Sequence, residues 1–151
     1  MRIDSSLYAT PSPETCGDTK DCTVRALRVA FAVPYDEARE VLERNGRVRG
    51  RGATGHIVRE ALAQMGGERH AEVPTVLRWN SGLEREMTLA QFTKRYGFGR
   101  YVVECRRHLI TVIDGVVHDW PRSGTGPRSR VRYAWRVWGV PDQSNTASSS
   151  V

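Results

Sequence analysis

The apolar residues in the first half of the chain recur every three or four positions, the spacing that places them on one face of an α-helix. Val24, Leu27 and Phe31 form the first such stripe. A second stripe begins near Pro34, which suits the first turn of a helix, and it ends at Gly46. A third stripe ends at paired glycines, a common helix stop. We therefore predict three helices, over residues 21–31, 33–46 and 54–67.

The second half has a different pattern, rich in β-branched and aromatic residues and divided by turn signals. A short helix is predicted first, over residues 88–97, with Thr88 as its N-cap. Asp114 and Gly115 are typical of a two-residue hairpin turn between strands. The sequence thus predicts an antiparallel sheet. Its expected strands lie within residues 99–106, 107–115, 116–120 and 131–140.

The size and composition fit one domain, because 151 residues with 39% hydrophobic content can bury a single core. Residues 1–20 contain proline, glycine and small polar residues and predict an extended lead-in. The domain is expected over 21–140, and the polar tail at 141–151 is expected to be disordered. The chain start lacks a signal-peptide pattern, and no run of eighteen apolar residues occurs, so we expect a cytoplasmic protein without membrane contact.

The charge is basic, at +6, and arginine supplies nearly all of it because Lys20 and Lys94 are the only lysines. Such a charge attracts nucleic acid or acidic partners, so an arginine-rich nucleic-acid-binding protein is one interpretation, although not the one we favour. Residues 46–53 form a glycine-rich basic segment that predicts either a solvated connection or a basic rim recruiting an acidic partner. Its arginines are Arg47, Arg49 and Arg51.

Cys22 lies at the predicted start of the first helix, where unpaired backbone N–H groups and the helix dipole favour a thiolate. A nucleophilic thiol needs a base from a distant segment, and His108, at the head of a predicted strand, is the best candidate. The alternative is that Cys22 is a small buried residue packed under the helix. We expect all three cysteines to be free thiols, since the count is odd and the compartment reducing. They are Cys16, Cys22 and Cys105.

The hairpin register brings an acid to this histidine. If the turn centres on residues 114 and 115, Ile113 pairs with Val116 and His108 faces position 121. Asp119 is then its diagonal neighbour on the same face of the sheet, about 7–8 Å away at Cα. A carboxylate there would hold the imidazole in the tautomer that accepts the thiol proton. Cys22, His108 and Asp119 are therefore the predicted catalytic triad.

The segments "DCTVRALRVAF" and "RHLITVIDGVVHDW" resemble a small papain-like cysteine peptidase fold, close to the bacteriocin-processing peptidases and to compact phage-encoded relatives. The resemblance implies an α+β fold with a helical N-terminal half packed on a C-terminal antiparallel sheet. It implies a nucleophile at Cys22, a base at His108 and an orienting acid at Asp119, with no cofactor. The family usually has an oxyanion-stabilising glutamine about six residues before the nucleophile, where this chain has Cys16.

Several functions follow from the resemblance. The first is a peptidase, amidase or deamidase that cleaves an amide or isopeptide bond in a protein or peptide, with Thr19 or Lys20 replacing the missing oxyanion donor. The alternative is a catalytically inactive module of the same fold that binds and inhibits a host protein, located in the host cytoplasm if the chain is phage-encoded.

A zinc site is the remaining alternative, because Cys105 and His108 have the spacing of a ligand pair. The gap between Cys16 and Cys22 is too long for a second pair, and Cys105 and His108 would point to opposite faces of one continuous strand, so we expect no metal. The other histidines are expected at the surface, and three tryptophans are expected to pack in or against the sheet. These are His56, His70 and His118, with His118 pointing away from Asp119, and Trp120, Trp135 and Trp138.

Overall fold

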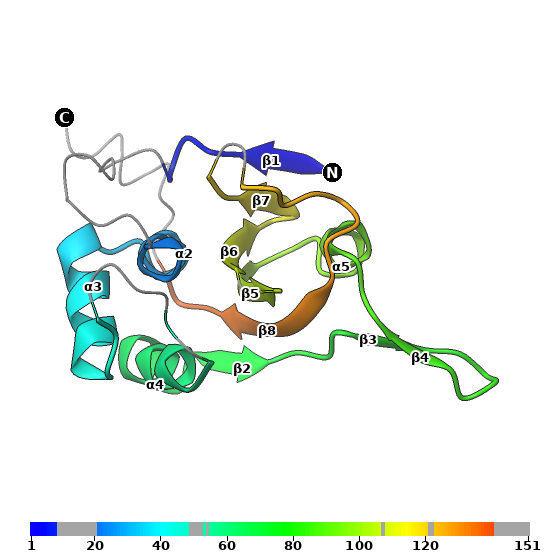
Figure 1. Cartoon of the computed structure of the whole chain (residues 1–151), viewed down its shortest axis with the longest axis horizontal. Helices are drawn as coiled ribbons and strands as arrows, with labels where there is room; N and C mark the ends of the chain where they lie inside the picture. The colour runs from blue at the N-terminus through cyan, green and yellow to red at the C-terminus, as the bar shows by residue number, and fades with distance from the viewer. Residues whose placement is uncertain (9–20, 49–52, 54, 107, 121–122, 141–151) are drawn as a thin grey trace.

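The computed structural model describes residues 1–8, 21–48, 53, 55–106, 108–120 and 123–140. Four helices lie in this part of the chain, at the predicted places and with ends that differ by a few residues. Together with a mostly antiparallel sheet they define an α+β fold (Figure 1). None of the described helices is long and apolar enough to cross a membrane. The helices are α2 (Cys22–Phe31), α3 (Tyr35–Arg44), α4 (Gly55–Gly66) and α5 (Leu89–Arg95).

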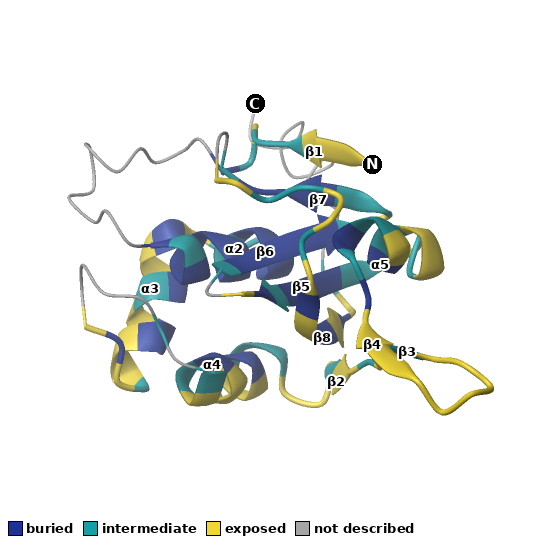
Figure 2. Ribbon diagram, turned by 45° about the vertical axis from the view of Figure 1, so that its right-hand side comes forward, coloured by how far each residue is buried: buried dark blue, intermediate teal, exposed yellow. Residues whose placement is uncertain are grey.

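The main sheet has six strands in the order β1-β7-β6-β5-β8-β2, and all neighbours are antiparallel except β1 and β7. The predicted hairpin register is correct, since Ile113 pairs with Val116 and Thr111 with His118. A separate two-stranded hairpin projects from the body of the molecule (Figures 1 and 2). The six strands are β1 (Arg2–Asp4), β2 (His70–Glu72), β5 (Arg100–Cys105), β6 (His108–Ile113), β7 (Val116–His118) and β8 (Val131–Val137), and the hairpin consists of β3 (Val76–Arg78) and β4 (Glu84–Glu86).

The sheet separates two hydrophobic clusters, because successive residues of a strand point to opposite faces. Val102 and Leu109 face the larger cluster, which includes α2, α3 and α4. Their neighbours Val103 and Ile110 face the smaller cluster, which is formed around Phe92 of α5. Helices therefore cover both faces of the central strands (Figure 2).

Helix α2 occupies the centre of the larger cluster and is buried on nearly every side. Val24 and Leu27 are fully buried, as their spacing predicts, but so is the charged Arg25. The hydroxyl of Thr111 donates a hydrogen bond of 2.7 Å to the carbonyl of Ala26, which ties the middle of α2 to β6. This contact fixes the position of Cys22, the first residue of α2, relative to His108, the first residue of β6.

The structure corrects the lead-in and the region around residues 70–86. Residues 2–4 form β1, which pairs in parallel with β7, and Tyr8 is fully buried. Strands β2, β3 and β4 were not expected, because three residues are too few to show a period and, unlike β7, none of these strands follows an Asp-Gly turn. The segments 9–20 and 141–151, including the tail predicted to be disordered, lie outside the described residues.

Three surface or packing predictions are also wrong. His118 is buried, at 8% exposure, because β1 covers the strand that carries it. Arg47 is buried too and so cannot belong to an exposed basic rim, and Trp138 is 45% exposed. His70 is partly exposed, and its ring lies 2.7 Å from the carbonyl of Gly67. By contrast, His56 is exposed and Trp135 packs in the core, as expected.

Candidate functional site

Cys22 is the first residue of α2, as predicted, and its side chain is half-buried. The preceding Asp21 does not cap the helix with its carboxylate, because Arg25 and Tyr35 donate hydrogen bonds of 2.8 and 2.9 Å to the same Asp21 oxygen. The thiol lies 3.9 Å from the hydroxyl of Thr23. The sulfur therefore stands at the positive end of a helix, with a neighbouring hydroxyl.

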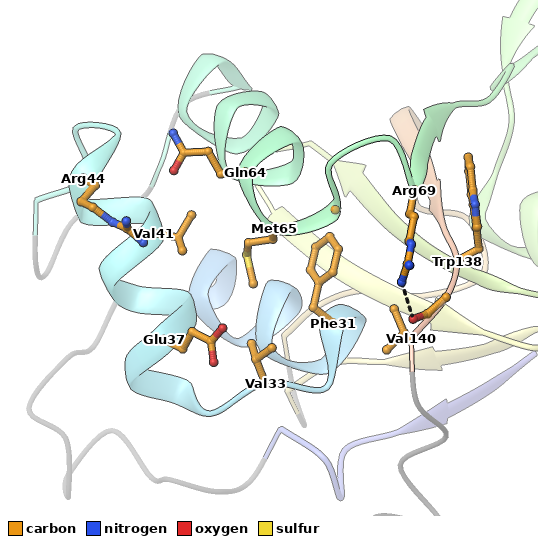
Figure 3. Close-up of a pocket in the computed structure, with 12 residues that line it drawn as sticks. Phe31, Val33, Glu37, Val41, Arg44, Gln64, Met65, Arg69, Trp138 and Val140 are labelled. Atoms are coloured by element: carbon orange, nitrogen blue, oxygen red, sulfur yellow. Dashed lines mark hydrogen bonds between the residues drawn. The ribbon is translucent and has the colours of Figure 1, made fainter.

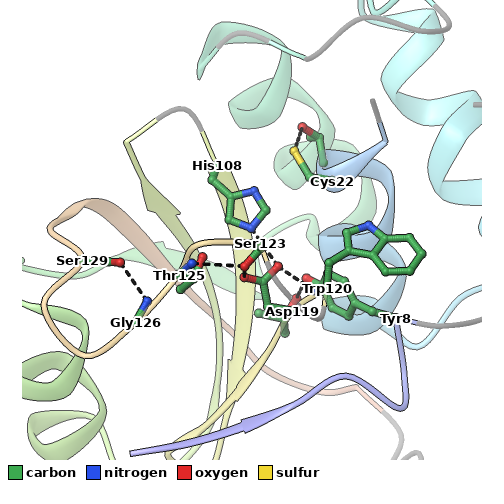
Figure 4. Close-up of polar contacts among 11 residues, drawn as sticks. Tyr8, Cys22, His108, Asp119, Trp120, Ser123, Thr125, Gly126 and Ser129 are labelled. Atoms are coloured by element: carbon green, nitrogen blue, oxygen red, sulfur yellow. Dashed lines mark hydrogen bonds and ion pairs between the residues drawn. The ribbon is translucent and has the colours of Figure 1, made fainter. Parts of the chain in front are cut away.

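His108 and Asp119 form the predicted pair. The ring Nε2–H of His108 donates to Oδ1 of Asp119 at 2.7 Å, with the imidazole 20% exposed and the carboxylate fully buried. Figure 4 shows the His108 ring with Asp119 on one side and Cys22 on the other. Because Nε2 is engaged by the carboxylate, Nδ1 is the nitrogen left to exchange a proton with the thiol.

The Asp119 carboxylate is held by further donors from its own loop. The backbone N–H of Trp120 donates to Oδ1 at 2.7 Å, and the Ser123 hydroxyl donates to Oδ2 at 2.6 Å (Figure 4). Burial raises the pKa of Asp119, but hydrogen bonds from His108 and Ser123 outweigh it, and the pKa lies below its ordinary value. Asp119 is therefore a fixed negative charge behind the imidazole.

The electrostatics favour an ion pair between the thiol and the ring. Burial raises the pKa of Cys22, but interactions with the His108 side chain and the Leu109 backbone N–H reverse the effect, so the pKa is lowered. Burial likewise opposes protonation of His108, yet Asp119 and Cys22 together raise its pKa to about 10. The charged forms of the thiol and the ring therefore stabilise each other.

A cavity of about 260 Å³ opens beside the thiol, lined by Cys22 and His108 among others. A larger cavity of about 680 Å³ lies at the other end of α2, around Phe31 and Met65 (Figure 3). The first and last residues of α2 are ~14 Å apart along the helix axis. Because the larger cavity contains no cysteine among its lining residues, the smaller one is the candidate active site.

Cys105, the other cysteine that the structure describes, is not part of this site, and the zinc alternative can be compared with its position. Cys105 is buried, and burial raises its pKa to about 12, which makes it an inert thiol. Cys105 and His108 lie on separate strands and pair directly across the turn between β5 and β6, so the parity argument against a zinc pair, which holds only for one continuous strand, does not apply. No group of three metal-ligating side chains occurs within the described ranges. Cys16, Thr19 and Lys20 fall outside them.

Sequence reasoning missed a buried cluster that surrounds the start of α2. Arg25 is fully buried, bonds Asp21 and the carbonyl of Tyr8, and lies 4.2 Å from the centre of the Trp120 ring. The only signal in the sequence is the spacing of Asp21 and Arg25, four residues apart on one helix. Ser123, the second donor to the site's carboxylate, has no signal in the sequence at all.

Comparisons of the chain with protein-family models, with curated proteins and with solved structures find no match. We therefore infer the function from the geometry and electrostatics of the site.

Proposed function

We propose that the protein is a papain-like thiol hydrolase, or acyl transferase, acting on an amide or isopeptide bond of a protein or peptide. The observation that carries the proposal is the 2.7 Å pair of His108 and Asp119 next to a Cys22 thiol of lowered pKa. A buried acid, an imidazole and a helix-start cysteine form the arrangement that activates a sulfur nucleophile.

The residues support a two-step reaction. The Cys22 thiolate attacks the substrate carbonyl carbon, and the electron pair of the carbonyl moves to its oxygen. The backbone N–H of Cys22, at the start of α2, is positioned to donate to that oxyanion. The His108 imidazolium gives its proton to the leaving amine as the carbon–nitrogen bond breaks, which leaves a thioester on Cys22 and a neutral ring.

In the second step the neutral His108 takes a proton from a water molecule, whose oxygen attacks the thioester carbon. The carbon–sulfur bond then breaks, the acid product departs, and the thiolate and imidazolium are restored. If an amine attacks instead of water, the product is a new amide. Throughout the cycle Asp119 keeps its negative charge and orients the ring.

The experiment uses a peptide-based probe with an electrophilic warhead, and the protein is analysed by intact mass and peptide mapping. We expect one covalent adduct, on Cys22, that is lost in Cys22→Ala and slowed in His108→Ala. Cys105→Ala is the matched control, since it removes a buried thiol and should label like the wild type. Absence of the adduct from the folded wild type would contradict the proposal.

A catalytically inactive module that binds a host protein is the other outcome of this experiment. It would be favoured if no probe labelled the wild type and if Cys22→Ala inhibited the host protein as strongly as the wild type does. Arg47 is buried and so would not contribute to a basic binding surface of such a module.

A further inference from the structure

The cavity beside the thiol has walls of two kinds. Ala53, Val58 and Leu109 give it an apolar lining, and Glu104 adds a carboxylate. The remaining lining residues are Cys22, Thr23 and His108. Among the described residues, Glu104 is therefore the only acidic one that lines the space in which a side chain next to the reacting bond would lie.

Glu104 occupies a position where the fold favours an apolar residue. It lies on β5, between β6 and β8 in the middle of the sheet. It points to the same face as Val102, the face that packs against α2. A half-buried carboxylate there lowers stability unless it is paired. Residues that break a local rule in this way are expected at functional sites.

The Glu104 carboxylate has no hydrogen bond or ion pair in the part of the chain that the structure describes, and burial raises its pKa. Arg132 and Arg59 act on it only as more distant charges. Neither arginine lines this cavity. Arg59 lies over the Tyr133 ring at 5.3 Å and lines a different cavity. Among the residues that the structure describes, no cation lies at ion-pair distance from this carboxylate, and a substrate can supply one.

We propose that Glu104 makes this cavity a pocket for a basic substrate side chain, so that the enzyme acts next to lysine or arginine. This inference rests on the proposed function. The apolar stem of lysine or arginine would lie along Ala53, Val58 and Leu109, while the cationic end would reach Glu104. A charge-assisted hydrogen bond of this kind corresponds to about 10- to 100-fold in rate between lysine and its uncharged analogue norleucine.

The test compares electrophilic peptide probes that differ only in the side chain next to the warhead: lysine, norleucine or glutamate. The measured quantity is the second-order rate of adduct formation on Cys22. For the wild type we expect lysine to exceed norleucine about 10- to 100-fold and glutamate to be slowest. This comparison needs no variant and therefore does not depend on one that folds.

The variant Glu104→Gln assigns the preference to the residue, because it removes the charge and keeps the shape. We expect it to abolish the advantage of lysine and to leave the norleucine rate within about threefold. Glu86→Gln on the exposed strand β4 is the matched control and should behave like the wild type. Equal rates for lysine and norleucine in the wild type, or a lysine preference that survives Glu104→Gln, would overturn the pocket while leaving the hydrolase in place. Failure of every probe to label Cys22 would overturn both.

Discussion

The substitution Asp119→Asn isolates what the buried carboxylate does for the imidazole. It keeps the size of the side chain and one oxygen at Oδ1, where the Trp120 N–H donates, and it places an NH2 group beside the Ser123 hydroxyl, which can accept from it. It removes the negative charge 2.7 Å from His108. The rise of the His108 pKa from 6.5 to about 10 corresponds to about 5 kcal/mol of preference for the imidazolium. Both Asp119 and Cys22 contribute to that preference, and burial opposes it.

An opposite charge at hydrogen-bond distance usually accounts for about 1–3 pH units, so we expect the His108 pKa in Asp119→Asn to fall to between about 7 and 9. The Cys22 pKa should rise as its cationic partner weakens. Titration of the imidazole by NMR measures the first value, and the rate of iodoacetamide labelling against pH measures the second. Asp36→Asn is the matched control, because the Asp36 side chain is 76% exposed on α3. A His108 pKa that stayed within about 0.5 units of the wild type would refute the role of Asp119.

The same substitution has a pH-dependent effect on stability. The His108 pKa is raised on folding, so its contribution is complete below the ordinary value of 6.5 and is lost as pH rises through about 10. The Asp119 pKa is lowered, so its contribution is complete above 3.8 and is lost as pH falls through the lowered value. The difference in free energy of unfolding between wild type and Asp119→Asn should therefore be largest between pH 3.8 and 6.5 and should shrink toward pH 10. Urea unfolding at several pH values measures it, and a difference that grew at high pH would contradict the ion pair.

Three further outcomes are expected. Iodoacetamide at neutral pH should modify Cys22 and spare Cys105 in the folded protein, because Cys105 is buried and its pKa is about 12; equal labelling in peptide maps would contradict this. Arg25→Met should lower the free energy of unfolding by about 3–5 kcal/mol, since it leaves a buried carboxylate without its cation, whereas Tyr35→Phe should cost about 1 kcal/mol. Leu27→Ala should cost about 2–5 kcal/mol in urea unfolding and leave the Cys22 pKa unchanged, because Leu27 is buried but lies more than one helical turn from Cys22.

The hairpin between β6 and β7 could be predicted in detail because its turn has a strong local cause. Asp114 and Gly115 have φ values of 49° and 78°, and a left-handed pair of this kind suits a two-residue turn. Once the turn is fixed, the register follows residue by residue, and with it the approach of His108 and Asp119. The candidate pair was thus encoded within a dozen consecutive residues.

Interactions between distant segments could not be predicted in this way. The parallel pairing of Asp4 with His118 joins strands more than a hundred residues apart, and nothing in either segment identifies the other. The expectation that His118 lies at the surface rests on strand alternation, which points it away from Asp119. Because β1 is the true edge strand, His118 is enclosed, and burial lowers its pKa.

The periodic pattern of apolar residues does not predict which charged residues are buried in the core. The spacing of Val24 and Leu27 places Arg25 off the apolar stripe of α2, which suggests solvent, but packing on several sides leaves α2 with almost no solvent face. Burying a guanidinium costs several kcal/mol unless it is paired, and here the partners are Asp21, the carbonyl of Tyr8 and the Trp120 ring. Asp21 directly precedes Cys22, and Trp120 directly follows Asp119. The positive charge of Arg25 is therefore stabilised by the two segments that carry the Cys22 thiol and the Asp119 carboxylate. The contacts that allow Arg25 to be buried also hold these two segments at a fixed separation.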